Sequence, residues 1–192
     1  MRAPALLAVA RTYSSTLAHG EGGQIVEAVA IRGGLDNSKG MTETVDLARL
    51  RALREARLGE RETSSPGYTH RWCELEGRLL DQGGALGLPP AGGEEWLDEL
   101  LARGVAFEQA GEVLEGEPSQ SQRNVAGLWR SGVSDAIVTG YALGEDGVWR
   151  QHCWGQRVDG RVIETTNEKR AYFGVRLTER DADRFAFAWE AS

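Results

Sequence analysis

An Asp-Gly pair between two apolar runs constrains the fold of this chain more than any other feature. The runs are Val148–Arg157 and Arg161–Thr166, and Asp159-Gly160 lies between them. Asp-Gly between apolar, strand-like runs is a strong short-range signal for a β-hairpin. The sequence therefore predicts two antiparallel strands over residues 148–166.

Two closures of this hairpin are possible, and they differ in where they place His152 and Glu164. A two-residue turn at Asp159-Gly160 would pair Val158 with Arg161. Because side chains alternate between the two faces of a strand, His152 and Glu164 would then lie on opposite faces.

A three-residue loop would instead pair Arg157 with Arg161. It needs a left-handed residue after a type I turn, and Gly160 stands at that position. His152 and Glu164 then share a face as diagonal neighbours, within reach of a hydrogen bond from the imidazole to the carboxylate. We predict this closure.

A histidine that a carboxylate orients serves proton transfer when a nucleophile stands beside it. Ser121 is the candidate, because it begins a predicted helix, Gln120–Arg130, shortly after Pro118. At a helix start, the positive end of the helix dipole and free backbone N–H groups can stabilise an oxyanion.

An ordered set of short motifs carries a resemblance to a known family. The chain reads Ser121-Gln122-Arg123-Asn124-Val125-Ala126, Thr139-Gly140-Tyr141-Ala142, His152-Cys153-Trp154, Val162-Ile163-Glu164-Thr165-Thr166 and Tyr172-Phe173-Gly174-Val175. In order and spacing these motifs resemble those of small phage and bacterial proteins related to the papain-like and transglutaminase-like thiol enzymes.

The resemblance implies an α+β fold with a papain-like or transglutaminase-like core. In such a core the helix at the nucleophile position packs on an antiparallel sheet, and here amino-terminal helices would be added. It also implies a catalytic set of Ser121, His152 and Glu164. Ser121 stands where the family has its nucleophilic cysteine, and Glu164 where it has aspartate. A hydroxyl is a far poorer nucleophile than a thiol at neutral pH.

Each residue of this set also has an ordinary structural interpretation. Ser121 can be a helix cap, His152 a structural histidine and Glu164 a solvated strand residue. The two cysteines, Cys73 and Cys153, are predicted to be small buried residues, and Cys153 should face away from its neighbour His152.

Four further residues are candidates for binding substrate or an oxyanion. Gln120 or Gln122 can supply a side-chain donor, although solvation is the commoner state of such residues. Asn124 lies on the helix of the nucleophile and is expected to make structural hydrogen bonds. Trp154 is expected to wall the site.

The rest of the chain divides into predicted elements and one linker. We expect an amino-terminal segment over residues 1–65, partly flexible with one helix, and a cysteine-hydrolase-like domain over residues 66–192. The further predicted elements are helices 42–58, 69–82 and 94–103, a strand or helix at 105–114, a strand at 136–143, a short apolar segment at 172–175 and a linker at 60–67.

Composition excludes several classes of protein. The formal net charge of −7 argues against a nucleic-acid partner, which needs a basic surface. Two cysteines and three histidines argue against a disulfide framework and against a zinc site, and we expect no metal or organic cofactor. We find no apolar run of the ~20 residues that a membrane span needs, and Arg11 interrupts the short apolar start. We therefore expect a cytoplasmic protein without membrane contact.

Two functions from different classes follow. The first is an acyl-transfer enzyme or a hydrolase acting on an amide, peptide or thioester. The second is a catalytically inactive pseudoenzyme that kept the cleft and binds a peptide or protein partner. A third possibility places the partner-specific role in residues 1–65.

Overall fold

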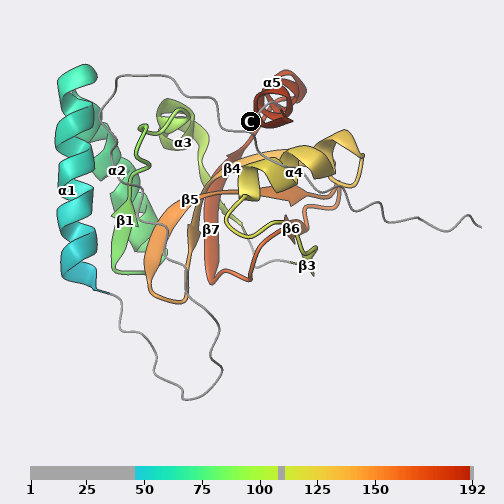
Figure 1. Ribbon diagram of the computed structural model, residues 1–192, viewed down its shortest axis with the longest axis horizontal. Coiled ribbons are helices and arrows are strands. Elements are labelled where there is room, and N and C mark those ends of the chain that lie inside the picture. Colours follow the sequence, from blue (N-terminus) through green and yellow to red (C-terminus); the bar gives the residue numbers. More distant parts are fainter. Residues whose placement is uncertain (1–45, 108–110, 191–192) are drawn as a thin grey trace, which may run out of the picture. The chain divides into compact units, whose positions relative to one another are not determined.

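Helices and strands follow one another along the chain, so the fold is mixed α+β, as predicted (Figure 1). The computed structural model describes residues 46–107 and 111–190. In this part of the chain the helices are α1 (Leu47–Ser64), α2 (Tyr68–Asp81), α3 (Leu97–Arg103), α4 (Ser121–Arg130) and α5 (Glu179–Glu190). The strands are β1 (Leu86–Leu88), β2 (Val105–Phe107), β3 (Glu112–Val113), β4 (Ala136–Leu143), β5 (Val148–Gln156), β6 (Val162–Glu164) and β7 (Ala171–Arg176).

The seven strands form one sheet in which β4 and β5 are central. The order is β2-β7-β4-β5-β6-β3, and β1 pairs in parallel with the first part of β5. β4 is buried along its whole length and pairs antiparallel with both β5 and β7. This run is the predicted strand 136–143, and its apolar and β-branched residues suit a strand covered on both faces.

One edge of β5 is shared by two short strands that do not meet. β1 pairs with residues 148–150 and β6 with residues 155–156. Among the described residues, no strand pairs with residues 151–154 on this edge. The gap holds His152 and is the place where the candidate site forms.

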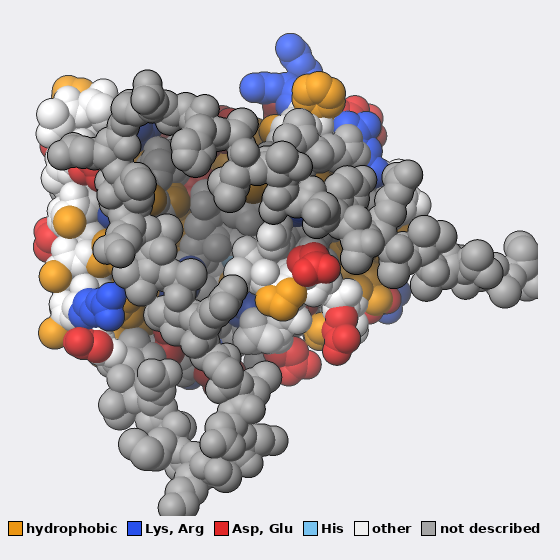
Figure 2. Space-filling model, in the orientation of Figure 1, with side chains coloured by type: hydrophobic (Ala, Val, Ile, Leu, Met, Phe, Trp, Pro, Cys, Tyr) orange, Lys and Arg blue, Asp and Glu red, His pale blue; other side chains and the backbone are white. Residues whose placement is uncertain are grey.

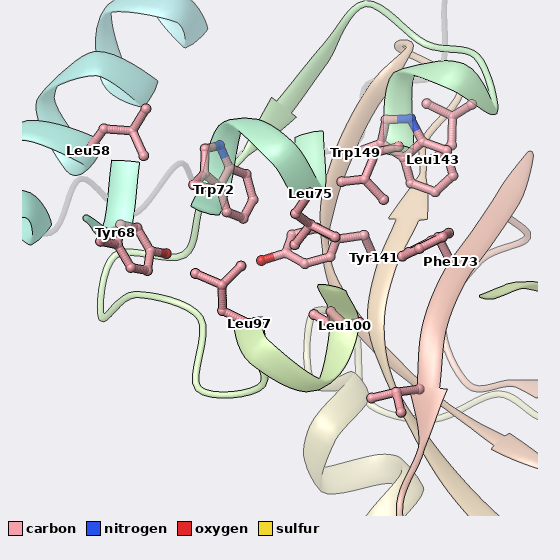
Figure 3. Packing of buried hydrophobic residues seen from close by; sticks show 12 residues of the cluster. Leu58, Tyr68, Trp72, Leu75, Leu97, Leu100, Tyr141, Leu143, Trp149 and Phe173 are labelled. Atoms are coloured by element: carbon pink, nitrogen blue, oxygen red, sulfur yellow. The ribbon is translucent and has the colours of Figure 1, made fainter. Parts of the chain in front are cut away.

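The largest buried cluster joins α1, α2 and α3 to β4, β5 and β7 (Figure 3). α2 supplies Trp72, Leu75 and Leu79, all fully buried, at the spacing of one helix face. The ring of Trp72 meets that of Tyr141 on β4 edge to face, with centroids 5.4 Å apart. A second cluster packs α4 and α5 on the sheet through Val125, Ile137, Cys153, Leu177 and Ala182.

The prediction of a linker at 60–67 is corrected by the structure, because α1 continues through Gly59 to Ser64. The carboxylate of Glu62 accepts the backbone N–H groups of Gly67 and Thr69, at 2.7 Å each, and so joins the end of α1 to the start of α2. The hydrogen bonds of Glu62 to the start of α2 therefore outweigh the stop signal of Gly59.

The expected boundary after Ser65 does not separate two compact units. α1 belongs to the unit that runs from Glu43 to Ser192. Its Leu58 is buried in the cluster around Trp72, and its Arg54 pairs with Glu76 on α2. The predicted helix start at Thr42 and the expectations for residues 1–40 lie outside the described residues.

Two further differences concern α5 and Cys73. The sequence analysis predicted no helix after Val175, where the structure has α5. Thr178 Oγ1 accepts the N–H of Asp181 at 3.2 Å and so caps the start of this helix. A Thr-x-x-Asp pattern signals such a cap. Cys73 is exposed rather than buried, because adjacent helical residues point about 100° apart and its neighbour Trp72 takes the core position.

The part of the surface that described residues form in Figure 2 carries acidic, basic and apolar side chains interspersed. Within residues 46–107 and 111–190, no helix combines the length and the apolar character that crossing a membrane requires.

The pair of Arg54 and Glu76 generates a prediction about stability. Glu76 is only 7% exposed, and Arg54 Nε lies 3.0 Å from both of its carboxylate oxygens. Arg54→Ala would leave a buried carboxylate without its cation. We therefore expect the free energy of unfolding, measured in urea, to fall by about 3 kcal/mol. Arg51→Ala, an exposed arginine on the same helix, is the matched control. Equal losses in the two variants would contradict the assignment.

Candidate active site

The hairpin closes through the three-residue loop, as predicted. Gly160 has φ +90°, its N–H donates to Arg157 O at 2.9 Å, and Arg157 N–H donates to Arg161 O at 2.9 Å. Gln156 and Gly155 pair with Val162 and Ile163 in the same register. Glycine permits this left-handed backbone at little cost, and the register of both strands follows from it.

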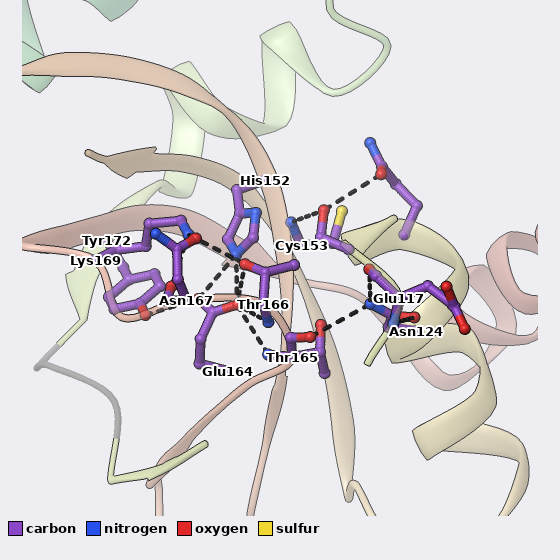
Figure 4. A network of polar contacts seen from close by, with 12 residues as sticks. Glu117, Asn124, His152, Cys153, Glu164, Thr165, Thr166, Asn167, Lys169 and Tyr172 are labelled. Carbon is purple, nitrogen blue, oxygen red and sulfur yellow. Dashed lines mark hydrogen bonds and ion pairs between the residues drawn. The ribbon is translucent and has the colours of Figure 1, made fainter. Parts of the chain in front are cut away.

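His152 and Glu164 consequently share a face and form a direct pair. His152 Nε2 lies 2.9 Å from Oε2 and 3.1 Å from Oε1 of Glu164 (Figure 4). His152 is 6% exposed and Glu164 is fully buried. Because the carboxylate takes Nε2, Nδ1 is the ring nitrogen that remains for a proton transfer in the cleft.

Glu164 also accepts four hydrogen bonds from other groups, which fix its orientation. Oε1 accepts the N–H groups of Thr165 and Thr166 and the hydroxyl of Thr166, each at 2.8 Å. Oε2 accepts the hydroxyl of Tyr172 on β7 at 2.8 Å. Lys169 Nζ donates in turn to Thr166 Oγ1 at 3.1 Å. The sequence reading did not assign Thr166, Lys169 or Tyr172 to the site.

These contacts set the charge of Glu164. Burial would raise the pKa of a carboxyl group, but hydrogen bonding and charge from His152, with the donors of Thr166, outweigh it and hold the pKa of Glu164 at about 2. Burial beside this carboxylate raises the pKa of Tyr172, which stays a donor. Burial lowers the pKa of Lys169, and the charge of Glu164 opposes that change.

Ser121 begins α4 at the same gap in the sheet. It is 5% exposed and stands one residue after the N-cap, Gln120, so the simple cap interpretation does not describe it. Its Oγ accepts the N–H of Cys153 at 3.4 Å and donates to Gln122 Oε1 at 3.2 Å. Among the described residues these are its hydrogen bonds, and none joins Ser121 directly to the ring of His152.

Ser121 and His152 both line one cleft of about 530 Å³. The residues that line it are Ser119, Ser121, Gln122, Ala142, Gly144, Glu145, Asp146, Arg150, Gln151, His152, Thr166, Asn167 and Lys169. Gln122 is thus at the cleft, whereas Gln120 is exposed, makes no capping bond with its side chain and does not line it.

Asn124 and Trp154 support the cleft from behind. The Asn124 side chain bonds the backbone of Glu117 at 2.9 and 3.1 Å and reaches Thr165 O at 3.4 Å, which joins α4 to two loops. Trp154 is fully buried, with its ring 6.3 Å from that of His152 and nearly parallel to it. The expectation that Trp154 walls the site is therefore corrected: it packs behind the imidazole.

A second buried carboxyl group, that of Glu94, binds the side chain of Gln151, which precedes His152 on β5. Glu94 is 6% exposed, and its Oε2 accepts Tyr141 Oη–H at 2.6 Å and an N–H of Gln151 at 3.1 Å. Burial raises the pKa of Glu94, which the three hydrogen bonds to Tyr141, Gln151 and Trp96 N–H oppose. The side chain of Gln151, which lines the cleft, is therefore tied to the loop that precedes α3.

Cys153 lies on the face opposite His152, against α4, as predicted. It is 1% exposed, and burial raises the pKa of its thiol to about 12. Its thiol therefore does not replace Ser121 as a nucleophile. In the described part of the chain, no three His, Cys, Asp or Glu side chains are grouped to hold a metal ion.

Comparisons of the chain with protein-family models, with curated proteins and with solved structures found no match.

The charge of Glu164 generates a prediction about pH. A folded pKa of about 2, below the ordinary value of 4.5, stabilises the protein above pH 4.5, and this contribution is lost as the pH falls to about 2. The contribution is about 3 kcal/mol, from 1.36 kcal/mol per pKa unit.

We expect Glu164→Gln to lose this part of the pH dependence in urea unfolding measured from pH 6 to pH 2. Glu168→Gln, an exposed glutamate on the following loop, should keep the profile of the parent protein. The same acid dependence in Glu164→Gln and in the parent protein would refute the assignment.

Proposed function

We propose that the cleft is an acyl-transfer or amide-hydrolase site, with Ser121 as nucleophile, His152 as proton carrier and Glu164 as the carboxylate that orients it. The observation that carries the proposal is the buried Glu164–His152 pair. An ionised carboxylate with four other donors, bonded to one imidazole nitrogen beside a cleft, is what a general base requires.

The proton transfers follow from the side of the ring that Glu164 occupies. Nε2 keeps its proton and donates to Glu164, so Nδ1 is the basic nitrogen. Ser121 Oγ, after rotating from Gln122 towards the ring, gives its proton to Nδ1 as it attacks the carbonyl carbon. The resulting imidazolium, stabilised by Glu164, then protonates the leaving group.

The developing oxyanion needs donors that are already in place. The backbone N–H of Cys153, now 3.4 Å from Ser121 Oγ, and the free N–H groups in the first turn of α4 are the nearest candidates. Gln122, at the cleft, is the side-chain candidate. Because α4 begins at the nucleophile, its dipole favours negative charge there.

A non-catalytic binding module is the second candidate, and one observation favours it. The Ser121 hydroxyl bonds to Gln122 and to the backbone of Cys153 rather than to His152. In that case the cleft would bind a peptide or protein partner without turnover.

Substitution by a thiol separates the two functions. Ser121→Cys should create a thiol whose pKa lies below the ~8.5 of free cysteine, because imidazolium and helix terminus both favour the thiolate. We expect iodoacetamide to alkylate residue 121 at pH 7 about tenfold faster than the exposed Cys73. Cys153, buried with its pKa at about 12, should react more slowly still. Peptide mapping by mass spectrometry measures all three rates in one sample.

His152→Ala in the same background should remove the advantage of residue 121, while the rate at Cys73 serves as the internal control. A thiol at 121 that reacts no faster than Cys73 would favour the binding module. The parent protein is then tested with an alkyl fluorophosphonate. Phosphonylation at Ser121, in which Oγ bonds to phosphorus and fluoride leaves, would show that the hydroxyl itself is a nucleophile.

A further inference from the structure

Lys169 lines the cleft, and hydrogen bonds within its own loop fix its ammonium group. Nζ donates to Thr166 Oγ1 at 3.1 Å, to Asn167 O at 2.6 Å and to Asn167 Oδ1. An ammonium group has three N–H donors and no acceptor, so these bonds use all of its donors. The proposed chemistry of Ser121 and His152 assigns no task to this residue.

The hydroxyl of Thr166 has one proton, and the two neighbours of its oxygen decide where that proton points. Thr166 Oγ1 lies 3.1 Å from Lys169 Nζ and 2.8 Å from Glu164 Oε1. Because an ammonium group can only donate, Oγ1 must accept from Lys169. The hydroxyl proton then points to the ionised carboxylate, which can only accept. Hydrogen bonds therefore run in one direction, from Lys169 through Thr166 to Glu164, and we call this series the relay.

The loop that Lys169 fixes also brings other donors to Glu164. The backbone N–H groups of Thr165 and Thr166 each donate to Glu164 Oε1 at 2.8 Å, beside the hydroxyl of Thr166 (Figure 4). Two of the bonds of Lys169 hold the next residue, Asn167, through its carbonyl and its side chain. Lys169 thus braces the segment that supplies three of the donors of Glu164.

We propose that Lys169 and Thr166 are positioning residues of the site. Lys169 directs the hydroxyl proton of Thr166 to Glu164, and the carboxylate held in this way binds Nε2 of His152. Hydrogen bonds in such a series polarise one another, so the loss of the first donor weakens the second. The inference rests on the proposed function for its meaning in catalysis, but the relay itself can be tested without turnover.

The experiment measures the free energy of unfolding in urea from pH 6 to pH 2, with the serine at position 121 unchanged. The part of the pH profile that Glu164→Gln removes gives the folded pKa of Glu164, which is about 2 in the parent protein. The other titratable groups bonded to this carboxylate, His152 on β5 and Tyr172 on β7, are the same in every variant.

Thr166→Val keeps the shape of the side chain but removes the hydroxyl donor. We expect it to raise the folded pKa of Glu164 by about one unit, the size expected for one hydrogen bond to a charged group. The stabilising contribution of Glu164 is then lost at a higher pH as the solution is acidified. Thr166→Ser, which keeps a hydroxyl, should retain the profile of the parent protein.

Lys169→Met removes the first donor of the relay and leaves the hydroxyl. We expect it to raise the folded pKa of Glu164 by about half a unit. In the Thr166→Val protein the same substitution should have less than half of this effect, because the connecting hydroxyl is gone. Arg170→Met, which removes a positive charge from the adjacent exposed residue, is the matched control and should leave the profile unchanged.

Two results would overturn the inference. A lysine that only braces the loop would, when replaced, lower the free energy of unfolding equally at pH 6 and at pH 2. A charge that acts on Glu164 only through space would give Lys169→Met the same effect with threonine or valine at position 166. Far-ultraviolet circular dichroism checks that all variants are folded.

The result is independent of the iodoacetamide test, because no thiol is introduced. A slow thiol in Ser121→Cys together with the expected pKa changes would reject the proposed function and retain Lys169 and Thr166 as the residues that position Glu164. A fast thiol without those changes would retain the proposed function and reject the relay.

Discussion

A carboxylate removed from water is destabilising by several kcal/mol unless donors surround it, and Glu164 is fully buried. Its donors come from separate parts of the chain: His152 from β5, Thr165 and Thr166 from the end of β6, and Tyr172 from β7. The carboxylate therefore requires the hairpin, the loop after it and the next strand to be in place together. The geometry of the His152–Glu164 pair is therefore coupled to the stability of the sheet.

The interruption along the edge of β5 explains why the site lies where it does. β1 and β6 cover the two ends of this edge, and between them the backbone of β5 meets the start of α4 instead of another strand. A continuous strand there would satisfy the backbone but leave no room for Ser121. Two buried carboxyl groups, Glu94 and Glu164, hold the side chains of Gln151 and His152 on opposite faces of the strand. The short lengths of β1 and β6 thus leave the edge of β5 open at His152.

Sequence reasoning succeeded where a local rule decides the outcome. Gly160 can take the left-handed conformation that the three-residue loop needs, and from that one residue the shared face of His152 and Glu164 follows. β4 and the start of α4 were also predictable, because their patterns are local and strong. The donors of Glu164 were not, since Tyr172 reaches it only through the pairing of β7 with β4. The place of Trp154 behind the imidazole likewise depends on long-range contacts. The extension of α1 past Gly59 depends on the hydrogen bonds of Glu62 to Gly67 and Thr69, which form only when the next helix is in place.

The hairpin loop constrains how this chain can vary in evolution. Val158, at its tip, is 86% exposed, and by the usual standards of surface loops its identity should drift freely. The length of the loop should not drift. Adding or removing one residue would shift the register of one of the two strands by one residue, and every side chain of that strand would then move to the opposite face of the sheet. On β5 that exchange would replace the imidazole of His152 with the thiol of Cys153 on the face of Glu164. Homologous sequences should therefore show a solvent-exposed segment in which substitutions are common and insertions are rare.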